Sequence, residues 1–209
     1  DDADGNHTPV HLGIPGRHNV MNALAAATVA MRYGMAPETV ARILASQHTI
    51  SPHRMALSTV NREGTSFTLI DDSFNANPDS MKAGLNGLKA WNSNDGKEPF
   101  RVALLGAMLE LGADETALHT SIGTYADELG IDAIIAVGSA QDQHLDALAQ
   151  ALADGARQSQ SASVDCVHDI DAAEQLVIDL ARNHPDAVVL LKGSHASGLS
   201  ALAERWAKN

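Results

Sequence analysis

The segment of this sequence with the richest set of reactive and hydrogen-bonding side chains is DDSFNANPDS, residues 71–80, which follows an apolar stretch ending at Ile70. A carboxylate at the end of a strand can hold ribose hydroxyls, and the amides of Asn75 and Asn77 can both donate and accept hydrogen bonds. Asp, Asn, Ser and Pro also favour turns and helix caps, so a plain turn is the alternative. A turn explains so long a polar run poorly, but the residues alone leave both interpretations open.

A second candidate is KGSHASG, residues 192–198, which follows the apolar run AVVLL. The ammonium of Lys192, the hydroxyl of Ser194 and open backbone N–H groups suit an anion at the end of a strand. The glycine spacing is not that of a Walker A phosphate loop. The segment therefore predicts an anion site of another kind, with an isolated lysine of no special role as the alternative.

The segment GAMLELG, residues 106–112, follows another apolar run and is a weaker candidate. Gly106 permits close approach of the backbone to a ligand. Glu110 is either a ligand or, more simply, an acid that caps a helix, and the second interpretation is favoured. His119 falls inside the helix predicted next, where a lone histidine is more often a surface or core residue than a catalytic one.

The segment GRHNVMNALAA, residues 16–26, places polar side chains at the start of an Ala-rich helix. Asn19 and Asn22 are three positions apart, so their side chains lie on one face of the first turn. A helix cap needs only one of them. Paired amides beside His18 could therefore read the edge of a flat heterocycle such as adenine.

The elements that position these segments alternate between short apolar strands and helices. The runs VALL, AIIAV and AVVLL are continuously apolar, as strands buried on both faces of a sheet require. Strands alternating with helices imply right-handed crossovers and a doubly wound, mostly parallel, Rossmann-like α/β sheet. A turn at residues 61–64 predicts one antiparallel edge strand. Ligands of such sheets sit at the carboxyl ends of the strands, where three of these four segments fall.

The expected elements can be placed along the chain by residue number. The predicted strands of the sheet cover residues 55–60, 66–71, 101–105, 133–137, 163–167 and 187–191. The predicted helices between them cover residues 80–90, 116–129, 142–153, 171–182 and 199–207. The first fifty residues predict a short strand at 10–14, a helix from Asn19 to Tyr33 that ends at Gly34, and a second helix that begins at Pro37.

The composition excludes several classes of protein. The 209 residues carry a formal net charge of −12, which disfavours nucleic-acid binding because phosphate backbones are repelled. The longest apolar runs are far too short to span a bilayer, so no membrane association is expected. Cys166 is the one cysteine and cannot form an internal disulfide. The histidines show no HExxH or other metal-binding spacing, and no GxSxG nucleophile motif occurs.

Taken together, these segments resemble the Mur ligases, a family of amide-forming enzymes of bacterial cell-wall synthesis. The matching stretches are GRHNVMNALAA, the Arg of SPHR, IDDSFNANPDSM, LLGAMLELG with the later His119, and LLKGSHASGL. They occur in the family's order and cover nearly the whole chain. DDSFNANP followed by MLELG is similar to the branch that adds D-alanyl-D-alanine, whereas a related branch would show a histidine-bearing loop like DYAHNP.

The resemblance implies a three-domain parent enzyme. Residues 1–50 would be the tail of its central ATPase domain, and residues 51–209 its complete C-terminal, Rossmann-like domain. No GKT-type phosphate loop occurs in the sequence, so the main phosphate and metal sites are expected outside this chain, and the chain alone is expected to be inactive. The implied cofactors are ATP and Mg²⁺. The implied reaction joins D-Ala-D-Ala to UDP-MurNAc-tripeptide through an acyl phosphate, in the cytoplasm, by a monomeric enzyme.

The resemblance also implies roles for individual residues. It gives nucleotide-binding roles to His18, Asn19 and Asn22 on the adenine side, and to Arg54 and Asp72 near the ribose. It gives the wall of the dipeptide and acyl-phosphate site to Asn75, Asn77, Lys192 and Ser194. The chain departs from the family at Ala107, where Asp is usual, and at His195, where Arg is frequent. The first change removes a charge, and the second weakens any bidentate carboxylate contact.

Two other functions are compatible with the sequence. One is a different amide ligase of the same superfamily, including a folylpolyglutamate-synthase-like enzyme, against which the loop around Asn75 argues. The other is a Rossmann-like binding module without catalytic activity. A self-contained module would not need the helices of the first fifty residues, so those helices favour the ligase.

Overall fold

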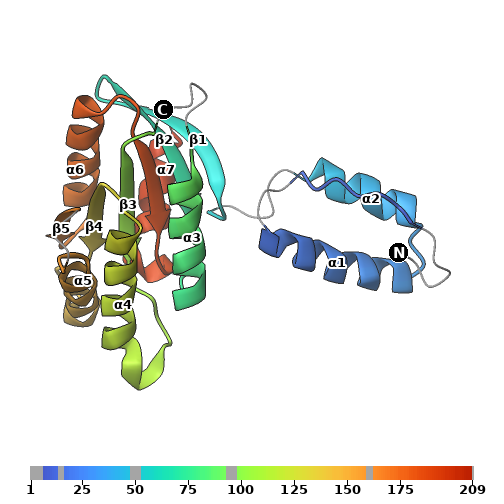
Figure 1. Cartoon of the computed structure of the whole chain (residues 1–209), viewed down its shortest axis with the longest axis horizontal. Helices are drawn as coiled ribbons and strands as arrows, with labels where there is room; N and C mark the ends of the chain where they lie inside the picture. Colours follow the sequence, from blue (N-terminus) through green and yellow to red (C-terminus); the bar gives the residue numbers. More distant parts are fainter. Residues whose placement is uncertain (1–6, 14–16, 48–52, 93–97, 159–161, 209) are drawn as a thin grey trace. The chain divides into compact units, whose positions relative to one another are not determined.

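The structure is a computed structural model, and it describes residues 7–13, 17–47, 53–92, 98–158 and 162–208. The chain divides into two compact units, Asp1–Pro52 and His53–Asn209. The described part of the first unit forms the helices α1 (Arg17–Arg32) and α2 (Pro37–Ser46), and the second unit holds an α/β sheet (Figure 1). The assignment of residues 1–50 to the tail of an ATPase domain stays a prediction.

The helices of the first unit end and begin where the sequence predicts. Gly34 follows α1 in the left-handed conformation, with φ of 89°. The N–H of Met35 donates to the carbonyl of Ala30 at 3.1 Å, which closes the helix with the bond pattern expected of a glycine stop. Pro37 is the first residue of α2. The strand predicted at residues 10–14 is wrong for the described residues 10–13, which form no strand and have no neighbouring strand to pair with.

The second unit is built on one six-stranded sheet. The strands are β1 (Ala56–Arg62), β2 (Thr65–Asp72), β3 (Arg101–Gly106), β4 (Ala133–Val137), β5 (Ser163–Val167) and β6 (Val188–Lys192). They lie in the order β1-β2-β6-β3-β4-β5, with β1 antiparallel to β2 and every other pair parallel. The expected Rossmann-like, mostly parallel sheet with one antiparallel edge strand is confirmed.

A tight turn produces the antiparallel edge. Glu63 and Gly64 both have positive φ, 46° and 77°, between the paired residues Arg62 and Thr65. Two central residues of positive φ make a type I′ turn, whose twist matches that of the flanking strands. The hairpin therefore continues the sheet beyond its parallel part.

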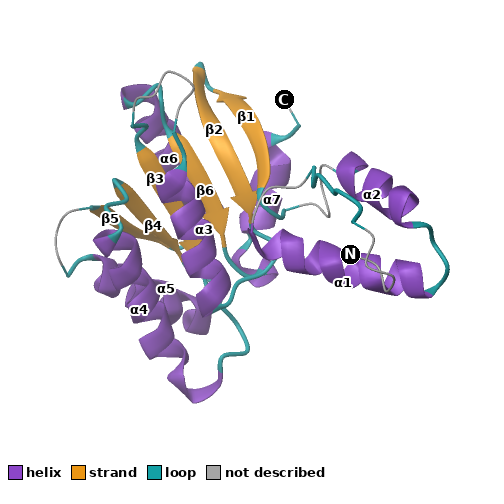
Figure 2. Ribbon diagram, turned by 45° about the vertical axis from the view of Figure 1, so that its right-hand side comes forward, coloured by secondary structure: helices purple, strands orange, loops and turns teal. Residues whose placement is uncertain are grey.

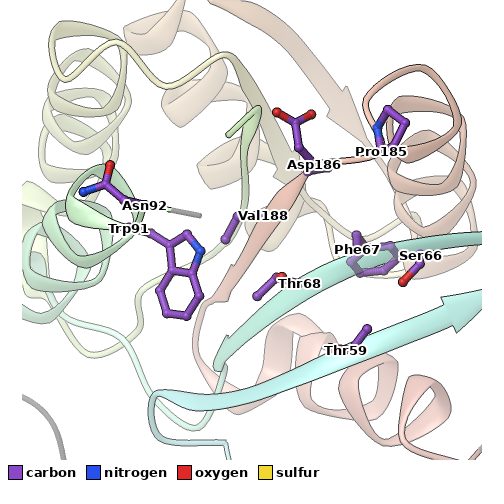
Figure 3. Close-up of a pocket in the computed structure, with 10 residues that line it drawn as sticks. Thr59, Ser66, Phe67, Thr68, Trp91, Asn92, Pro185, Asp186 and Val188 are labelled. Carbon is purple, nitrogen blue, oxygen red and sulfur yellow. The ribbon is translucent and has the colours of Figure 1, made fainter. Parts of the chain in front are cut away.

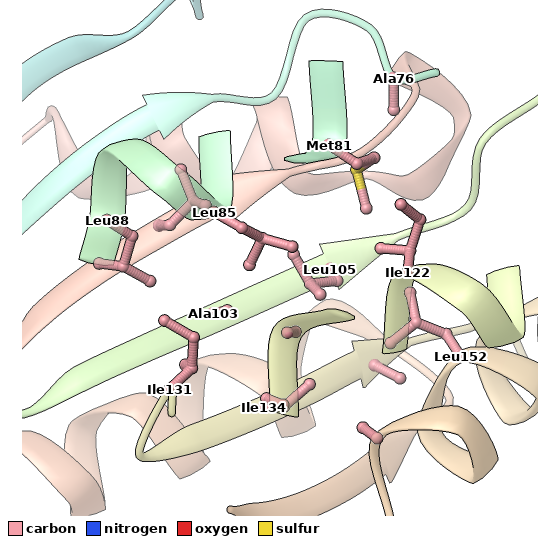
Figure 4. Packing of buried hydrophobic residues seen from close by; sticks show 14 of the residues in the cluster. Ala76, Met81, Leu85, Leu88, Ala103, Leu105, Ile122, Ile131, Ile134 and Leu152 are labelled. Carbon is pink, nitrogen blue, oxygen red and sulfur yellow. The ribbon is translucent and has the colours of Figure 1, made fainter. Parts of the chain in front are cut away.

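Helices cover both faces of the sheet. The α-helices of this unit are α3 (Pro78–Ala90), α4 (Glu115–Glu128), α5 (Gln143–Ala156), α6 (Ile170–Asn183) and α7 (Leu199–Trp206), with short 3₁₀ helices at Gly112–Asp114 and His195–Ser197. One buried apolar cluster joins α3, α4 and α5 to one face, and another joins α6 and α7 to the other face (Figure 2). Leu85 of α3, Ile122 of α4 and Leu105 of β3 meet in the first cluster (Figure 4). This double covering explains why β3, β4 and β6 are buried along their whole length.

A buried carboxylate fastens the terminal helix to the sheet. Glu174 of α6 is 8% exposed. Its side chain accepts from Trp206 Nε1 at 2.9 Å and from Arg205 Nη1 at 2.6 Å, and Arg62 Nε lies 3.2 Å away. The ring of Trp206 packs edge-on against Phe67, with centroids 5.2 Å apart. Glu174 therefore connects β1, α6 and α7.

Replacing Glu174 by alanine should lower the free energy of unfolding by about 2 kcal/mol, because the buried indole N–H loses its acceptor and two guanidinium groups lose their partner. Urea unfolding followed by circular dichroism would measure the loss. Asp179→Ala, on the exposed side of the same helix, is the matched control. Asp179 pairs with Arg182 at 2.8 Å in solvent, and its loss should cost below about 1 kcal/mol. Equal losses in the two variants would contradict the role of Glu174.

Candidate functional site

The polar segments of the second unit meet at the carboxyl edge of the sheet. β6 lies between β2 and β3, so the loops after these three strands are neighbours. In the strand register, Lys192 is the partner of both Asp72 on one side and Leu105 on the other. Residues that are far apart in the sequence, in DDSFNANP, KGSHASG and GAMLELG, are thereby brought to one place.

Asp72 and Lys192 form the charged centre of this edge. Lys192 Nζ lies 2.7 Å from Asp72 Oδ2, and the side chains are 3% and 17% exposed. The same ammonium donates to the backbone carbonyl of Asn75 at 2.9 Å. The other carboxylate oxygen of Asp72 accepts from the N–H of Met55 at 3.3 Å. Both charged groups thus have protein partners in this structure, and the ligand roles predicted for them stay predictions.

The two asparagines of the loop have different surroundings. Asn77 caps α3: its Oδ1 accepts from the N–H of Ser80 at 2.8 Å, and Ser80 Oγ accepts from the N–H of Asn77 at 3.0 Å. This reciprocal pair is a capping box, so the plain turn-and-cap interpretation accounts for Asn77. Asn75 is exposed, and its Oδ1 accepts from the N–H of Ala76 at 2.8 Å. Asn75 is therefore the better placed of the two to reach a ligand.

Ser194 presents an unpaired polar atom at the same edge. Its residue is 4% exposed, and Ser194 Oγ has no hydrogen-bond partner among the described residues. Its N–H donates to the carbonyl of Ala107 at 2.9 Å, which ties the loop after β6 to the loop after β3. A buried hydroxyl without a partner costs about 1–3 kcal/mol, and a ligand atom would remove that cost. Its neighbour His195 is exposed.

Two glycines let these loops approach each other closely. A Cβ added at Gly106 would lie 2.4 Å from Ser197 Cβ, and one at Gly193 would lie 3.0 Å from Gly106 Cα. Neither position has room for a side chain. The prediction that Gly106 permits close approach is thus matched by a contact within the protein, between the ends of β3 and β6.

The GAMLELG loop is held by His119. The N–H of Met108 donates to His119 Nε2 at 2.9 Å, and His119 Nδ1 lies 2.7 Å from the carbonyl of Glu115. His119 is 0% exposed, so it is a core residue, as the sequence favoured. Burial lowers the pKa of His119 below its ordinary value, and the hydrogen bond to Glu115 opposes that shift. Glu110 is exposed with a φ of 62° and caps no helix; Asp114 precedes α4.

Phe74 and His53, which the sequence analysis does not single out, lie beside the predicted site residue Arg54. Arg54 lies with its guanidinium carbon 4.3 Å from the ring centroid of Phe74, whose residue is 44% exposed. The N–H of Phe74 donates to the carbonyl of His53 at 3.1 Å, and His53 Nδ1 lies 2.7 Å from Asp71 Oδ2. A phenylalanine inside a polar loop, in a chain with 3% aromatics, was the available signal. Arg54 is thus exposed and held in place.

The residues predicted on the adenine side lie in the first unit. Asn22 Nδ2 donates to Asn19 Oδ1 at 3.4 Å, so the two amides share one face of α1 as expected. The side chain of His18 lies outside the described part of the structure. These residues stay candidates for a nucleotide contact.

A hollow at the other end of the sheet is separate from this edge. Its volume is about 230 Å³, and Trp91, Thr59, Thr68 and Asp186 are among its lining residues (Figure 3). Ala187 and Val188, which also line it, stand at the amino end of β6. Parallel sheets bind ligands at their carboxyl ends, so we do not place the functional site here.

Comparison with known proteins identifies the family. The family model described as "Mur ligase, glutamate ligase domain" matches residues 53–195. This chain belongs to the Mur ligase family. Across the described ranges, the His, Cys, Asp and Glu side chains of this Mur ligase chain form no group of three that could hold a metal ion. Among its described helices, none has both the length and the apolar character needed to cross a bilayer.

Two relatives of this Mur ligase chain have the same name. The UDP-N-acetylmuramoyl-tripeptide–D-alanyl-D-alanine ligase of Mycobacterium tuberculosis is 39% identical over 201 residues, which are 93% of this chain and 39% of that protein. The ligase of the same name from Escherichia coli is 35% identical over 129 residues, 62% of this chain and 26% of that protein. The chain therefore spans about two fifths of the Mycobacterium tuberculosis protein, and its match to the Escherichia coli protein covers about a quarter of that protein.

Solved structures agree with this similarity. A crystal structure of MurF from Acinetobacter baumannii superposes with a TM-score of 0.75 and 27% identity, covering 97% of this chain and 42% of that one. MurF from Thermotoga maritima, solved in complex with ADP, superposes with a TM-score of 0.63 over 93% of this chain and 40% of that one. Its identity of 21% shows a shared fold.

Proposed function

We propose that this chain is the acceptor-binding part of an ATP-dependent ligase that joins D-alanyl-D-alanine to UDP-MurNAc-tripeptide. The observation that carries the proposal is the 39% identity, over 93% of the chain, to a relative with that activity in its name. The polar edge of the sheet supports it, because Ser194 offers an unpaired hydroxyl there. The reaction uses nucleotide substrates, and we propose that it takes place in the cytoplasm.

Each part of the edge has a proposed task. The guanidinium of Arg54, exposed and stacked on Phe74, would meet the nucleotide, and Asp72 would meet its ribose. Asn75 and Ser194 would orient the dipeptide through an exposed amide and a buried hydroxyl. Holding the amine of the dipeptide in line with an activated carboxylate converts a bimolecular step into an intramolecular one. Exclusion of water at the buried part of the edge would limit hydrolysis of the activated carboxylate.

The described residues include candidate contacts for the nucleotide but no cluster of ligands for the metal. ATP would supply the phosphoryl group that activates the tripeptide carboxylate. In the second unit, the exposed guanidinium of Arg54 over the Phe74 ring suits a phosphate group. In the first unit, taken by itself, the paired amides of Asn19 and Asn22 suit the edge of an adenine. The described residues offer no carboxylate cluster for Mg²⁺, so we assign no metal-binding role to them.

The gene product that carries this sequence should release phosphate from ATP only when both UDP-MurNAc-tripeptide and D-Ala-D-Ala are present. Coupled phosphate release and mass spectrometry of the pentapeptide product would measure it. Arg54→Ala should raise the KM for ATP about tenfold, because a charged hydrogen bond contributes about 1.5–3 kcal/mol. Arg157→Ala is the matched control, since Arg157 pairs with Asp154 at 3.3 Å on the exposed end of α5.

Two results would contradict the proposal. One is phosphate release that depends on a single amino acid, or on glutamate with a folate, in place of D-Ala-D-Ala; another ligase of the superfamily would then be the answer. The other is no phosphate release with any acceptor, together with tight binding of a small ligand. That result would favour the binding module.

A further inference from the structure

The side chain of Lys192 is buried along its whole length. It leaves the end of β6 and passes over α3 at Gly84, where a Cβ would lie 3.0 Å from Lys192 Cδ and 3.6 Å from Lys192 Cε. The absence of a side chain at Gly84 leaves the space that the aliphatic stem occupies. The side chain is 3% exposed. An ammonium at this depth is stable only with close partners, because desolvation of a charge is costly.

The ammonium uses all of its donors inside the protein. Lys192 Nζ lies 2.7 Å from Asp72 Oδ2, 3.4 Å from the carbonyl of Asp72 and 2.9 Å from the carbonyl of Asn75. A lysine ammonium has three N–H donors, so no donor is left for a ligand in this arrangement. Two of the three acceptors are backbone carbonyls of one loop. The charge of Lys192 is matched by the carboxylate of Asp72.

We infer that Lys192 is a positioning residue: its buried ammonium fixes the conformation of the 72–75 loop through hydrogen bonds and does not contact the substrate. By drawing two carbonyls of the loop inward, it leaves the side chain of Asn75 exposed at the edge. It also holds the carboxylate of Asp72, whose other oxygen accepts from Met55 N. The inference rests on the proposed function for its catalytic consequence. Its structural part, a loop held by an internal ammonium, is independent of that function.

The structural part is tested by amide hydrogen exchange on the 209-residue chain. Lys192→Met keeps the length of the stem and removes the charge and the donors. The amide of Ala76, which donates to Asn75 Oδ1, should exchange about tenfold faster, since its loop is no longer held. The amide of Leu145, which donates to Asp142 at the start of α5, is the internal control and should not change.

A second variant, Gly84→Ala, crowds the aliphatic part of the Lys192 side chain without altering its charge. Gly84→Ala places a methyl group against Lys192 Cδ, whereas Gly87→Ala, one turn later in α3, meets only Met55 Cε at 3.2 Å. Both changes favour the helix equally. We expect faster exchange at Ala76 in Gly84→Ala, by about threefold, and no change in Gly87→Ala. This pair keeps the inference testable if Lys192→Met does not fold.

The catalytic part is tested in the gene product that carries the sequence. Lys192→Met should raise the KM for D-Ala-D-Ala about tenfold. Gly84→Ala should raise it less, and Gly87→Ala should leave it unchanged. Lys192→Arg should rescue little, because a planar guanidinium cannot direct three donors from one point toward these acceptors.

The possible outcomes distinguish the positioning role of Lys192 from the proposed ligase function. If Lys192→Met abolishes activity and leaves exchange at Ala76 unchanged, Lys192 contacts the substrate directly and the inference is wrong. Unchanged exchange and unchanged KM also overturn it. If no ligase activity is found but Ala76 exchanges faster, the proposed function fails and the positioning role of Lys192 stands.

Discussion

Replacing Gly123 by alanine is expected to lower the free energy of unfolding of this chain by about 3 kcal/mol or more. Gly123 lies on α4 where that helix crosses α5. A Cβ at this position would lie 1.9 Å from the carbonyl oxygen of Leu152 and 2.8 Å from the amide nitrogen of Ala156. Both atoms are backbone, so no side-chain rotation can make room. The two helices would have to move apart, which would open the packed layer beneath them.

The crossing is close from both sides. A Cβ at Gly155 of α5 would lie 2.0 Å from the carbonyl oxygen of Thr120 on α4. Thr124 Oγ1 donates to the carbonyl of Gly155 at 3.3 Å, a bond between the helices that separation would break. Gly155→Ala should therefore cost about as much as Gly123→Ala. The double variant should cost less than the sum, because helices already separated by one methyl group accommodate the other.

Guanidinium unfolding of the purified 209-residue chain measures these effects. Gly87→Ala is the control, since it also replaces a helical glycine but meets only the flexible end of Met55, and should be neutral or stabilising by up to about 1 kcal/mol. A loss below about 1 kcal/mol in Gly123→Ala would show that the helices do not cross as described.

The elements of the sheet follow from the sequence because each reflects a local property. The continuous apolar run at residues 133–137 coincides with β4, and the strand predicted at residues 163–167 coincides with β5. Pro37 and Gly34 mark a helix start and a helix end. The predicted strand at residues 10–14 is wrong for the described residues 10–13, because a strand needs a partner strand and the described part of the first unit contains none.

The order of the strands could not be derived from the sequence. β6 is the last strand of the chain and inserts between β2 and β3. That insertion brings Lys192 beside Asp72, although 120 residues separate them in the sequence. Residue types therefore predicted which loops meet at the carboxyl edge, but not which side chains neutralise each other there. The sequence predicts an anion site at Lys192, and that stays a prediction, because a lysine at a strand end looks the same in a sequence whether its partner is a ligand or a carboxylate.

The site loop itself separates into two kinds of residue. Asn77 caps a helix, as Asn and Asp residues often do. Its capping box with Ser80 can be recognised in the sequence, because the two residues are three positions apart. Asn75 and Phe74 are exposed, and neither residue takes part in the capping box of α3. Ser194 is set apart by its burial, since its hydroxyl has no hydrogen-bond partner among the described residues. Burial is a property of the whole fold, so the sequence could not supply it.

His119 is expected to be the residue whose loss most affects the GAMLELG loop. Replacing it by alanine should lower the free energy of unfolding by about 3 kcal/mol, because a buried cavity forms and the N–H of Met108 loses its acceptor. Met108 N donates to Nε2, so that nitrogen carries no proton, and Nδ1, which faces the carbonyl of Glu115, carries it. His144→Ala, an exposed histidine 3.3 Å from Glu115, is the control and should cost below about 1 kcal/mol.

The same bonds make stability depend on pH through His119. Burial lowers its pKa in the folded state below the ordinary value of 6.5, so the folded imidazole stays neutral where the unfolded one binds a proton. The unfolded state therefore binds more protons as the pH falls below about 6.5, and the folded state loses stability in that direction. Glu115 opposes the shift and His144 adds to it, but burial is the largest cause.

Measuring the free energy of unfolding of the wild type and of His119→Gln between about pH 7.5 and about pH 5 isolates this contribution. Glutamine can accept from the N–H of Met108 but cannot titrate. The wild type should lose more stability than the variant as the pH falls, and the difference should disappear above about pH 7 apart from a constant offset. Parallel curves for the two proteins would mean that His119 takes up its proton in the folded state over the same pH range as in the unfolded state. Its Nε2 could not then accept from Met108, and the loop would have to be held by other contacts.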